Sequence, residues 1–213
     1  MRRFAVLLLS IWLLPLAAFG FEEGIEYQRV VPPQPTDDPS KVEVVELFWY
    51  GCPHCYHFEP ILEAWAKNKP DYVYFKRIPA IFRDSWVPFA RAYYTAQVLG
   101  VLDRIHGPLF KAIHVERRNL NSEAALRAFF AEHGVKPEDF DRTYRSFAVE
   151  NDVRRAADLT RRYGINGVPA IVINGKYRTD GTISGSLANV PKVIDYLVQK
   201  EHAAQQAAPP SGN

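Results

Sequence analysis

After the first 40 residues, the pattern of hydrophobic and polar positions predicts a strand, a helix and a second strand. Residues 41–50 (KVEVVELFWY) are β-branched and aromatic without strict alternation, which is typical of a strand buried on both faces. Residues 71–78 (DYVYFKRI) predict the second strand. Between them, apolar residues recur at helical spacing at Phe58, Ile61, Leu62 and Trp65. This order predicts a parallel βαβ unit.

The next 70 residues show a helical pattern and little β pattern. Ser122 and Glu123 are typical of a helix start, and Gly134 of a helix end. The last helical segment is long, so we expect it to contain more than one helix, with a break near residues 148–151. The predicted helical segments are residues 87–100, 102–116, 122–134 and 137–164.

Strand patterns return towards the C-terminus. Residues 168–175 (VPAIVING) are apolar, and Asn174-Gly175 is a two-residue hairpin signal leading into KYRTDG. Residues 186–200 predict a closing amphipathic helix, and the polar, small residues after it predict a disordered tail. The chain therefore predicts an α/β fold in which both flanking halves share one sheet and the helical block is an insertion.

The first twenty residues are typical of a secretory signal peptide. Arg2 and Arg3 precede an apolar run over residues 4–16, and the small residues Ala18 and Gly20 suit a cleavage site. The apolar run is short of the roughly 20 residues that span a bilayer. We predict cleavage after Gly20, with a retained membrane anchor as the alternative.

Export changes how the composition is interpreted. The chain has 26 basic and 24 acidic residues, and removal of the signal's two arginines leaves the two signs equal. This balance gives no indication of nucleic-acid binding. The chain has 2 cysteines, Cys52 and Cys55, whereas a disulfide-stapled exported scaffold would carry more. Because a loop this short restrains the unfolded chain little, the pair indicates chemistry.

The segment Cys52-Pro53-His54-Cys55 lies where the first strand leads into the helix. Pro53 suits the first helical position, so Cys52 meets the partly positive N–H groups that stabilise a thiolate. Cys55 lies one turn later and should be more buried. We therefore predict that Cys52 is the attacked and attacking sulfur and that Cys55 resolves. His54 can add a second positive charge, and a stabilised thiolate makes the disulfide a strong oxidant.

Other uses of this segment are less favoured. A zinc site could take Cys52, His54, Cys55 and His57, but these four are crowded on one turn and no second cysteine pair exists to complete a site. A c-type haem needs histidine directly after the second cysteine, where Tyr56 stands. A static structural disulfide remains a minor alternative. We expect neither a metal nor a cofactor beyond the redox-active pair.

Several blocks in this order resemble the DsbA family, the periplasmic thiol:disulfide oxidases of Gram-negative bacteria. They are CPHCY at residues 52–56, Phe58-Glu59, Gly167-Val168-Pro169 and NGKY at residues 174–177. The resemblance covers nearly all of residues 22–200 and implies a thioredoxin fold with an inserted all-helical domain. The implied divisions are a thioredoxin domain in two parts (21–83 and 155–200), the helical insertion (84–154) and a disordered tail (201–213).

The resemblance also implies roles for residues outside the cysteine segment. Pro169 corresponds to a cis-proline facing the disulfide, and the main chain of Val168 to the part that pairs with an extended substrate. The alternative is an ordinary trans proline at a strand start.

Two acids in this sequence match acids that the family places near the buried cysteine. Glu46 and Glu59 would exchange the proton of Cys55, unless they are partly solvated carboxylates. The family adds a base on the next strand, where Lys76 and Arg77 point to opposite faces, and we favour Arg77.

The implied activity is donation of the Cys52–Cys55 disulfide to newly exported, cysteine-containing proteins through a mixed disulfide at Cys52. A membrane partner of the DsbB type, linked to quinone, would reoxidise the pair, and the protein would act as a monomer in the periplasm. A disulfide isomerase or reductase is one alternative, but the periplasmic isomerases carry an N-terminal dimerisation domain for which residues 21–41 leave no room. A non-catalytic folding helper that holds unfolded chains is another.

Overall fold

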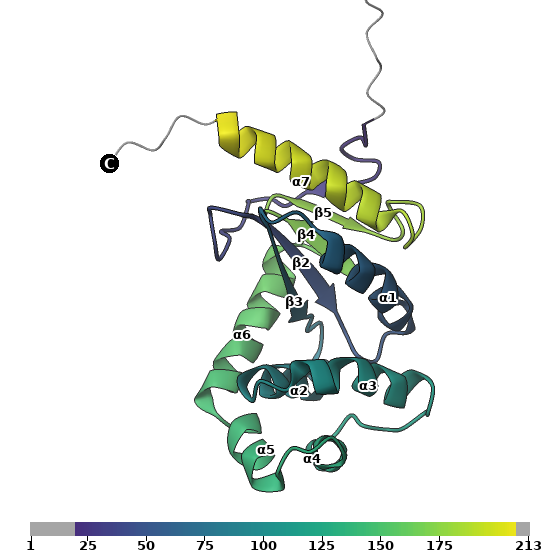
Figure 1. The fold of residues 1–213 in the computed structure, drawn as a ribbon, viewed down its shortest axis with the longest axis vertical. Coiled ribbons are helices and arrows are strands. Elements are labelled where there is room, and N and C mark those ends of the chain that lie inside the picture. Colours follow the sequence, from purple (N-terminus) through teal and green to yellow (C-terminus); the bar gives the residue numbers. More distant parts are fainter. Residues whose placement is uncertain (1–19, 208–213) are drawn as a thin grey trace, which may run out of the picture.

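The computed structural model describes residues 20–207, in which one sheet carries helices on its faces and a block of helices at one end (Figure 1). The sheet order is β1-β5-β4-β2-β3, with β2 and β3 parallel and the other neighbours antiparallel. Its strands are β1 (Gln28–Arg29), β2 (Val42–Phe48), β3 (Val73–Pro79), β4 (Ala170–Ile173) and β5 (Tyr177–Asp180). The predicted parallel unit and the sheet shared by both flanking halves are confirmed.

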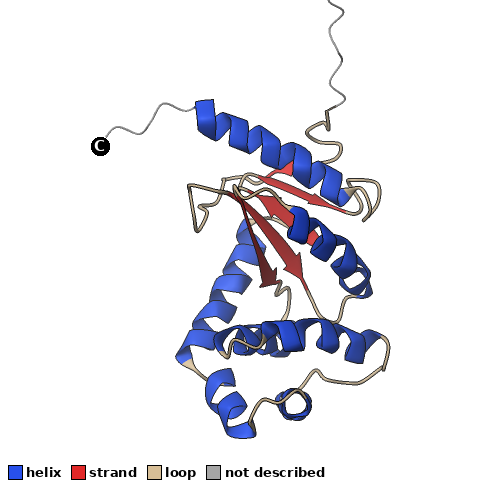
Figure 2. Ribbon diagram, in the orientation of Figure 1, coloured by secondary structure: helices blue, strands red, loops and turns tan. Residues whose placement is uncertain are grey.

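The helices form two groups, which Figure 2 separates clearly from the strands. Helices α1 and α7 pack on one face of the sheet, whereas the block from α2 to α5 lies beyond the ends of β2 and β3, and α6 leads back to the sheet (Figure 1). Their bounds are α1 (Pro53–Asn68), α2 (Val87–Val98), α3 (Leu102–His114), α4 (Glu123–Glu132), α5 (Pro137–Tyr144), α6 (Phe147–Arg162) and α7 (Val190–Ala207), with a short 3-10 helix η1 (Asp84–Trp86) before α2.

Strand β2 separates two hydrophobic cores and is buried along its whole length, as its sequence predicts. Val44 belongs to the core that includes Leu62 of α1 and Val193 of α7. Val45, the next residue, belongs to the core that includes the helical block and α6. Because neighbouring side chains of a strand point to opposite faces, β2 supplies one residue set to each core.

Helix boundaries around α6 differ from the sequence expectation. The break within residues 137–164 comes at Arg145 and Ser146, a few residues earlier than expected, because the Ser146 hydroxyl accepts the Val149 N–H and caps α6. Helix α6 then continues without interruption, so the expected division between residues 154 and 155 falls inside it.

The chain end also differs from the expectation of a disordered tail. Helix α7 extends to Ala207, so residues 201–207 are helical. The carboxylate of Glu201 is buried and accepts hydrogen bonds from Asn174 (2.6 Å) and Lys176 (2.7 Å), which anchors this part of the helix to the β4–β5 turn. That turn has three residues, 174–176, instead of two. The predicted signal peptide and the last six residues of the tail lie outside the described residues, apart from Gly20.

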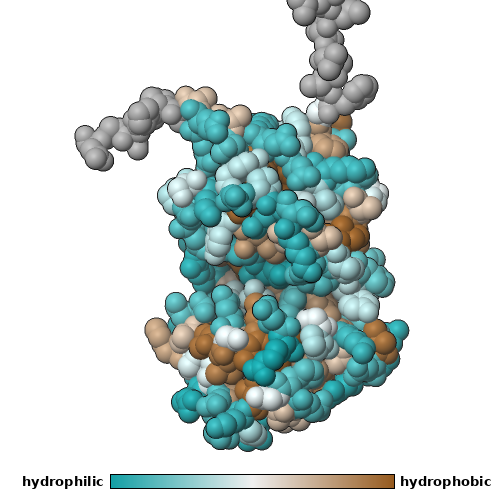
Figure 3. Space-filling model, viewed as in Figure 1, coloured by the Kyte–Doolittle hydropathy of each residue, from teal (hydrophilic) through white to brown (hydrophobic). Residues whose placement is uncertain are grey.

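The surface of the face in Figure 3 is mainly hydrophilic, and its hydrophobic side chains gather over the helical block. Val98, Val115 and Phe147 of this part of the chain are large hydrophobic residues with about half or more of their surface exposed. Within residues 20–207, no helix has the length and apolar character needed to cross a membrane.

Candidate active site

The Cys52–Cys55 segment starts helix α1 directly after strand β2. Cys52 is the N-cap residue with extended backbone angles, and Pro53 takes the first helical position, as predicted. The preceding glycine is required by packing, because a Cβ on Gly51 would lie 2.4 Å from the Trp49 ring. That ring stacks on Trp86 with centroids 4.3 Å apart. The turn therefore holds Cys52 at the helix N-terminus, where backbone N–H groups are free to face its sulfur.

The two sulfurs lie in unlike environments, and both cysteines are free thiols in this structure. Cys52 is 9% exposed and Cys55 is 0% exposed. A hydrogen bond from the Cys55 thiol, helped by backbone N–H groups and the charge of His54, lowers the pKa of Cys52 to about 6. Burial, followed by the neighbouring Cys52 sulfur, raises the pKa of Cys55 well above its ordinary value. At neutral pH, Cys52 is therefore mostly a thiolate and Cys55 a thiol.

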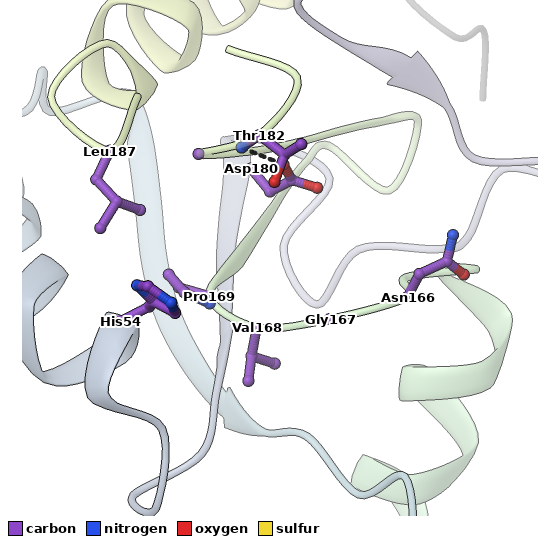
Figure 4. A pocket seen from close by; sticks show the side chains of 9 residues that line it. His54, Asn166, Gly167, Val168, Pro169, Asp180, Thr182 and Leu187 are labelled. Atoms are coloured by element: carbon purple, nitrogen blue, oxygen red, sulfur yellow. Dashed lines mark hydrogen bonds between the residues drawn. The ribbon is translucent and has the colours of Figure 1, made fainter. Parts of the chain in front are cut away.

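The peptide bond between Val168 and Pro169 is cis, as predicted, and lies against the cysteine segment. The Sγ atom of Cys52 is 3.4 Å from the carbonyl oxygen of Val168. His54, an exposed residue, lines the same hollow as Val168 and Pro169 (Figure 4). The hollow measures about 530 Å³, and its remaining lining residues are Asn166, Gly167, Asp180, Gly181, Thr182 and Leu187.

A group of buried acids lies behind the cysteines, between β2, β3 and α1. The parallel register pairs Glu46 with Arg77. The Arg77 guanidinium donates to Glu46 (2.9 Å), Glu59 (2.8 Å) and Glu63 (2.6 Å). Lys76 points to the other face of the sheet, where it contacts different carboxylates. The register question that the sequence left open is therefore decided in favour of Arg77.

The acids differ in proton affinity although they share one cation. Burial outweighs the charge of Arg77 and raises the pKa of Glu46 to about 8. Burial would also raise the pKa of Glu59, but His106 and Arg77 outweigh it, so that the pKa lies below its usual value. The charge of Glu46 also raises the pKa of Cys55. The protonation of this group is thus coupled to the buried thiol.

Comparisons with known proteins identify the family to which this geometry belongs. A family model described as "DSBA-like thioredoxin domain" matches residues 73–188. The thiol:disulfide interchange protein DsbA of Pseudomonas aeruginosa is 41% identical over 187 residues, covering 88% of this chain and 89% of that protein. The chain belongs to the DsbA family.

Solved structures of the family agree with this assignment. The crystal structure of Pseudomonas aeruginosa DsbA matches with a TM-score of 0.84 and 41% identity, covering 87% of this chain and 97% of the other. That of the oxidoreductase DsbA from Xylella fastidiosa matches with a TM-score of 0.78 and 37% identity, covering 84% and 96%. This DsbA family member therefore has a thioredoxin fold with a helical insertion, and it is a protein thiol:disulfide oxidoreductase that acts on substrate proteins.

Sequence reasoning missed two side chains of this group: Glu63, which shares Arg77, and His106, whose Nε2 atom lies 3.3 Å from Oε1 of Glu59. Glu63 follows Glu59 by four positions on α1, so the helical period alone places both on one face. His106 interrupts an apolar stripe that includes Ile105, Leu109 and Phe110, which marks it as a polar residue facing the core. No sequence signal connects either residue to Arg77.

His54 and His57 lie near the two cysteines on α1. In the chain between residues 20 and 207, no three His, Cys, Asp or Glu side chains are grouped so that they could hold a metal ion. His54 and His57 are both exposed on α1, and the ring of His57 lies 5.6 Å from that of Tyr56.

Proposed function

We propose that this DsbA family member donates its Cys52–Cys55 disulfide to newly exported proteins in the periplasm. The observation that carries the proposal is the contrast between the two sulfurs: Cys52 retains some exposed surface and has a lowered pKa, whereas Cys55 is fully buried and has a raised one. A substrate thiolate attacks Cys52, and the Cys55 sulfur leaves with the electron pair of the broken bond. The second thiolate of the substrate then displaces Cys52, which leaves this protein reduced.

The direction of transfer follows from the same contrast. Stabilisation of the Cys52 thiolate lowers the free energy of the reduced form, so the disulfide is the better oxidant. The burial of Cys55 keeps its thiol out of reach of bulky partners, so the mixed disulfide forms at Cys52. A reductase would need the opposite preference, in which the reduced form gives its electrons away.

The hollow beside Cys52 suits an extended substrate segment. The Val168 carbonyl lies next to the Cys52 sulfur and can accept a main-chain N–H from a strand bearing the reacting cysteine. Pro169 and His54 line this hollow and would contact residues flanking that cysteine. Main-chain recognition of this kind admits many sequences, as a general oxidant of exported proteins requires.

Reoxidation completes the cycle. The Cys52 thiolate of the reduced pair would attack a disulfide of a membrane partner of the DsbB type, and Cys55 would then displace that partner, which passes the electrons on to quinone. The protein would work as a monomer. The acid group formed by Glu46, Glu59 and Arg77 would take up the proton that Cys55 loses. No further cofactor takes part.

The proposal can be tested by trapping. Cys55→Ala leaves Cys52 without its resolving thiol, so covalent complexes with exported proteins should accumulate and disappear on reduction. Cys52→Ala is the matched control and should form none. If Cys52→Ala protects unfolded proteins as well as the wild type does and no complexes form with Cys55→Ala, the chain is a folding helper. A glutathione equilibrium that favours the disulfide would contradict the donor role.

A further inference from the structure

His106 of α3 belongs to the buried acid group, although the reaction described above does not use it. The residue is 7% exposed. Its Nδ1 atom lies 2.7 Å from the Tyr50 hydroxyl, and its Nε2 atom lies 3.3 Å from Oε1 of Glu59. Nε2 makes no aligned hydrogen bond within residues 20–207. The ring thus connects the turn before Cys52 to the first acid of α1 beyond Cys55.

The tautomer of His106 follows from its two partners, Tyr50 and Glu59. Burial, with Tyr93 nearby, raises the pKa of Tyr50 well above its ordinary value, so the phenol keeps its proton. Because an ionised Glu59 carboxylate can only accept, the nitrogen that faces it, Nε2, carries the ring proton, and Nδ1 can then accept from the Tyr50 hydroxyl. In this arrangement the Nε2–H of His106 points towards the Glu59 carboxylate.

Aromatic rings surround much of His106. The rings of Phe48, Tyr50, Tyr93 and Phe110 lie with centroids 5.2 to 6.0 Å from the imidazole. The titratable or charged groups that face it are Tyr50 before α1, Tyr93 of α2 and Glu59 of α1, with Arg77 of β3, Glu46 of β2 and Glu63 of α1 one contact further away.

The acid group is short of positive charge. Among the described residues, Arg77 is the one strong base that contacts Glu46, Glu59 and Glu63. The side chain of Glu63 is 40% exposed and lies at the outer edge of the group. The inner pair, Glu46 and Glu59, cannot both be ionised at low cost, because like charges in a buried site repel strongly. One of the two therefore holds a proton at neutral pH, and the contacts of each carboxyl decide which.

We propose that His106 is a positioning residue that acts through Glu59: its Nε2–H keeps Glu59 ionised and so makes Glu46 the carboxyl that exchanges a proton with Cys55. When the disulfide is attacked, the Cys55 sulfur leaves as a thiolate, and the Glu46 carboxyl protonates it and becomes a carboxylate. When the pair is reoxidised, the Cys55 thiol returns that proton. This assignment rests on the proposed function for its reaction step, but the protonation pattern can be measured without it.

The direct test is an NMR titration of the reduced protein with carbon-13 in the glutamate carboxyl groups. In the wild type, one buried carboxyl should titrate near pH 8, and Glu46→Gln should remove that signal. His106→Leu removes the donor, so the pKa of Glu59 should rise and that of Glu46 should fall. His106→Gln keeps a side-chain N–H donor and should preserve the wild-type pattern.

Two further variants keep the test decisive. His106→Asn is too short to reach Glu59 yet can still meet Tyr50, so it should behave as His106→Leu even if the leucine variant does not fold. His114→Gln is the matched control, because His114 lies on the same helix and contacts the carbonyl oxygen of Tyr50 at 2.7 Å but none of the acids. It should leave the titration unchanged.

The rate of mixed-disulfide formation at Cys52 over a range of pH supplies the second measurement. The pH at which this rate is half of its limiting value should be lower in His106→Leu than in the wild type and unchanged in His106→Gln. An unchanged carboxyl titration in His106→Leu, or an equal shift in the leucine and glutamine variants, would overturn the assignment. Loss of mixed-disulfide formation in the unaltered protein would instead refute the proposed function and leave the titration result standing.

Discussion

Strand β2 carries two buried glutamates, Glu43 and Glu46, whose surroundings differ in one decisive respect. Both are 0% exposed, and each contacts a cation of the neighbouring strand β3. They lie three positions apart, so they occupy opposite faces of the sheet. Glu46 faces α1 and the cysteines, whereas Glu43 faces the side from which α6 approaches.

The Glu43 side is balanced in charge. Lys76 contacts Glu43 at 2.8 Å and Asp37 at 2.5 Å, and Arg155 of α6 also contacts Asp37 at 2.5 Å. Glu43 accepts the Asp37 N–H as well, at 3.0 Å. Two acids thus meet two bases within the described chain, and the group ties the segment before β2 to β3 and α6. Such an arrangement pairs each acid with a base and serves to hold these segments together.

The Glu46 side has three acids for one strong base, and this shortage is the physical difference that allows chemistry. Burial, which Arg77 does not fully offset and to which the charge of Glu59 adds, raises the pKa of Glu46 to about 8, so this carboxyl retains its proton at neutral pH. Burial of an acid alone therefore does not mark a functional residue. The ratio of acids to bases around it, together with its coupling to Cys55, distinguishes Glu46 from Glu43.

The largest effect is expected from removing the cation on each side. Arg77→Met leaves three acids without their base and should lower the free energy of unfolding by about 3–5 kcal/mol at pH 7. The loss should grow with pH, because carboxyls without a cation have folded-state pKa values above the unfolded ones. Lys76→Met should cost about 2 kcal/mol, because Asp37 keeps Arg155 and the lysine is partly exposed. Urea unfolding at pH 5, 7 and 8 measures both, and equal losses would contradict the comparison.

A smaller, pH-dependent effect is expected from the two glutamates. The folded-state pKa of Glu46, about 8, exceeds its ordinary value of 4.5, so the folded form binds more protons and loses stability as pH rises through that window. Glu46→Gln removes this loss. Its stability relative to the wild type should therefore increase by about 3 kcal/mol between pH 5 and pH 8.

Glu43→Gln is the matched control on the same strand. It breaks a charge-balanced group, so it should be less stable than the wild type throughout this pH range and show no comparable gain towards pH 8. Thermal or urea unfolding of both variants over the same pH series tests the contrast. A similar gain in both variants would mean that the shortage of positive charge does not distinguish the two sides.

The smallest effect is expected at His54, on the exposed side of the cysteines. The Cys55 thiol and the helix N–H groups precede His54 among the groups that lower the pKa of Cys52. His54→Ser should therefore raise that pKa by less than one unit and shift the potential by less than about 30 mV, since the two quantities move together. Thiolate absorbance and the glutathione equilibrium measure them, with His57→Ser as the exposed control. If neither quantity changes, the helix terminus and Cys55 act alone.

Much of the site was accessible from local sequence patterns. The βαβ order, the place of Cys52 at a helix start and the asymmetry of the two sulfurs follow from strand and helix periodicity, because these depend on neighbouring residues. Strand alternation also showed that Lys76 and Arg77 face opposite sides. The resemblance to the DsbA family supplied the roles of Glu46, Glu59 and Pro169, which periodicity alone does not provide.

The remaining features depend on contacts between residues distant in the chain. The register of β2 against β3 decided that Arg77 meets Glu46, and the docking of α3 on α1 brought His106 to Glu59 across 47 positions. The buried Glu201 likewise extended α7 into the expected tail. The sequence by itself determined which groups could carry a proton or a thiolate. Only the tertiary structure decided which do, because the proton affinity of a buried carboxyl depends on the charges that packing places around it.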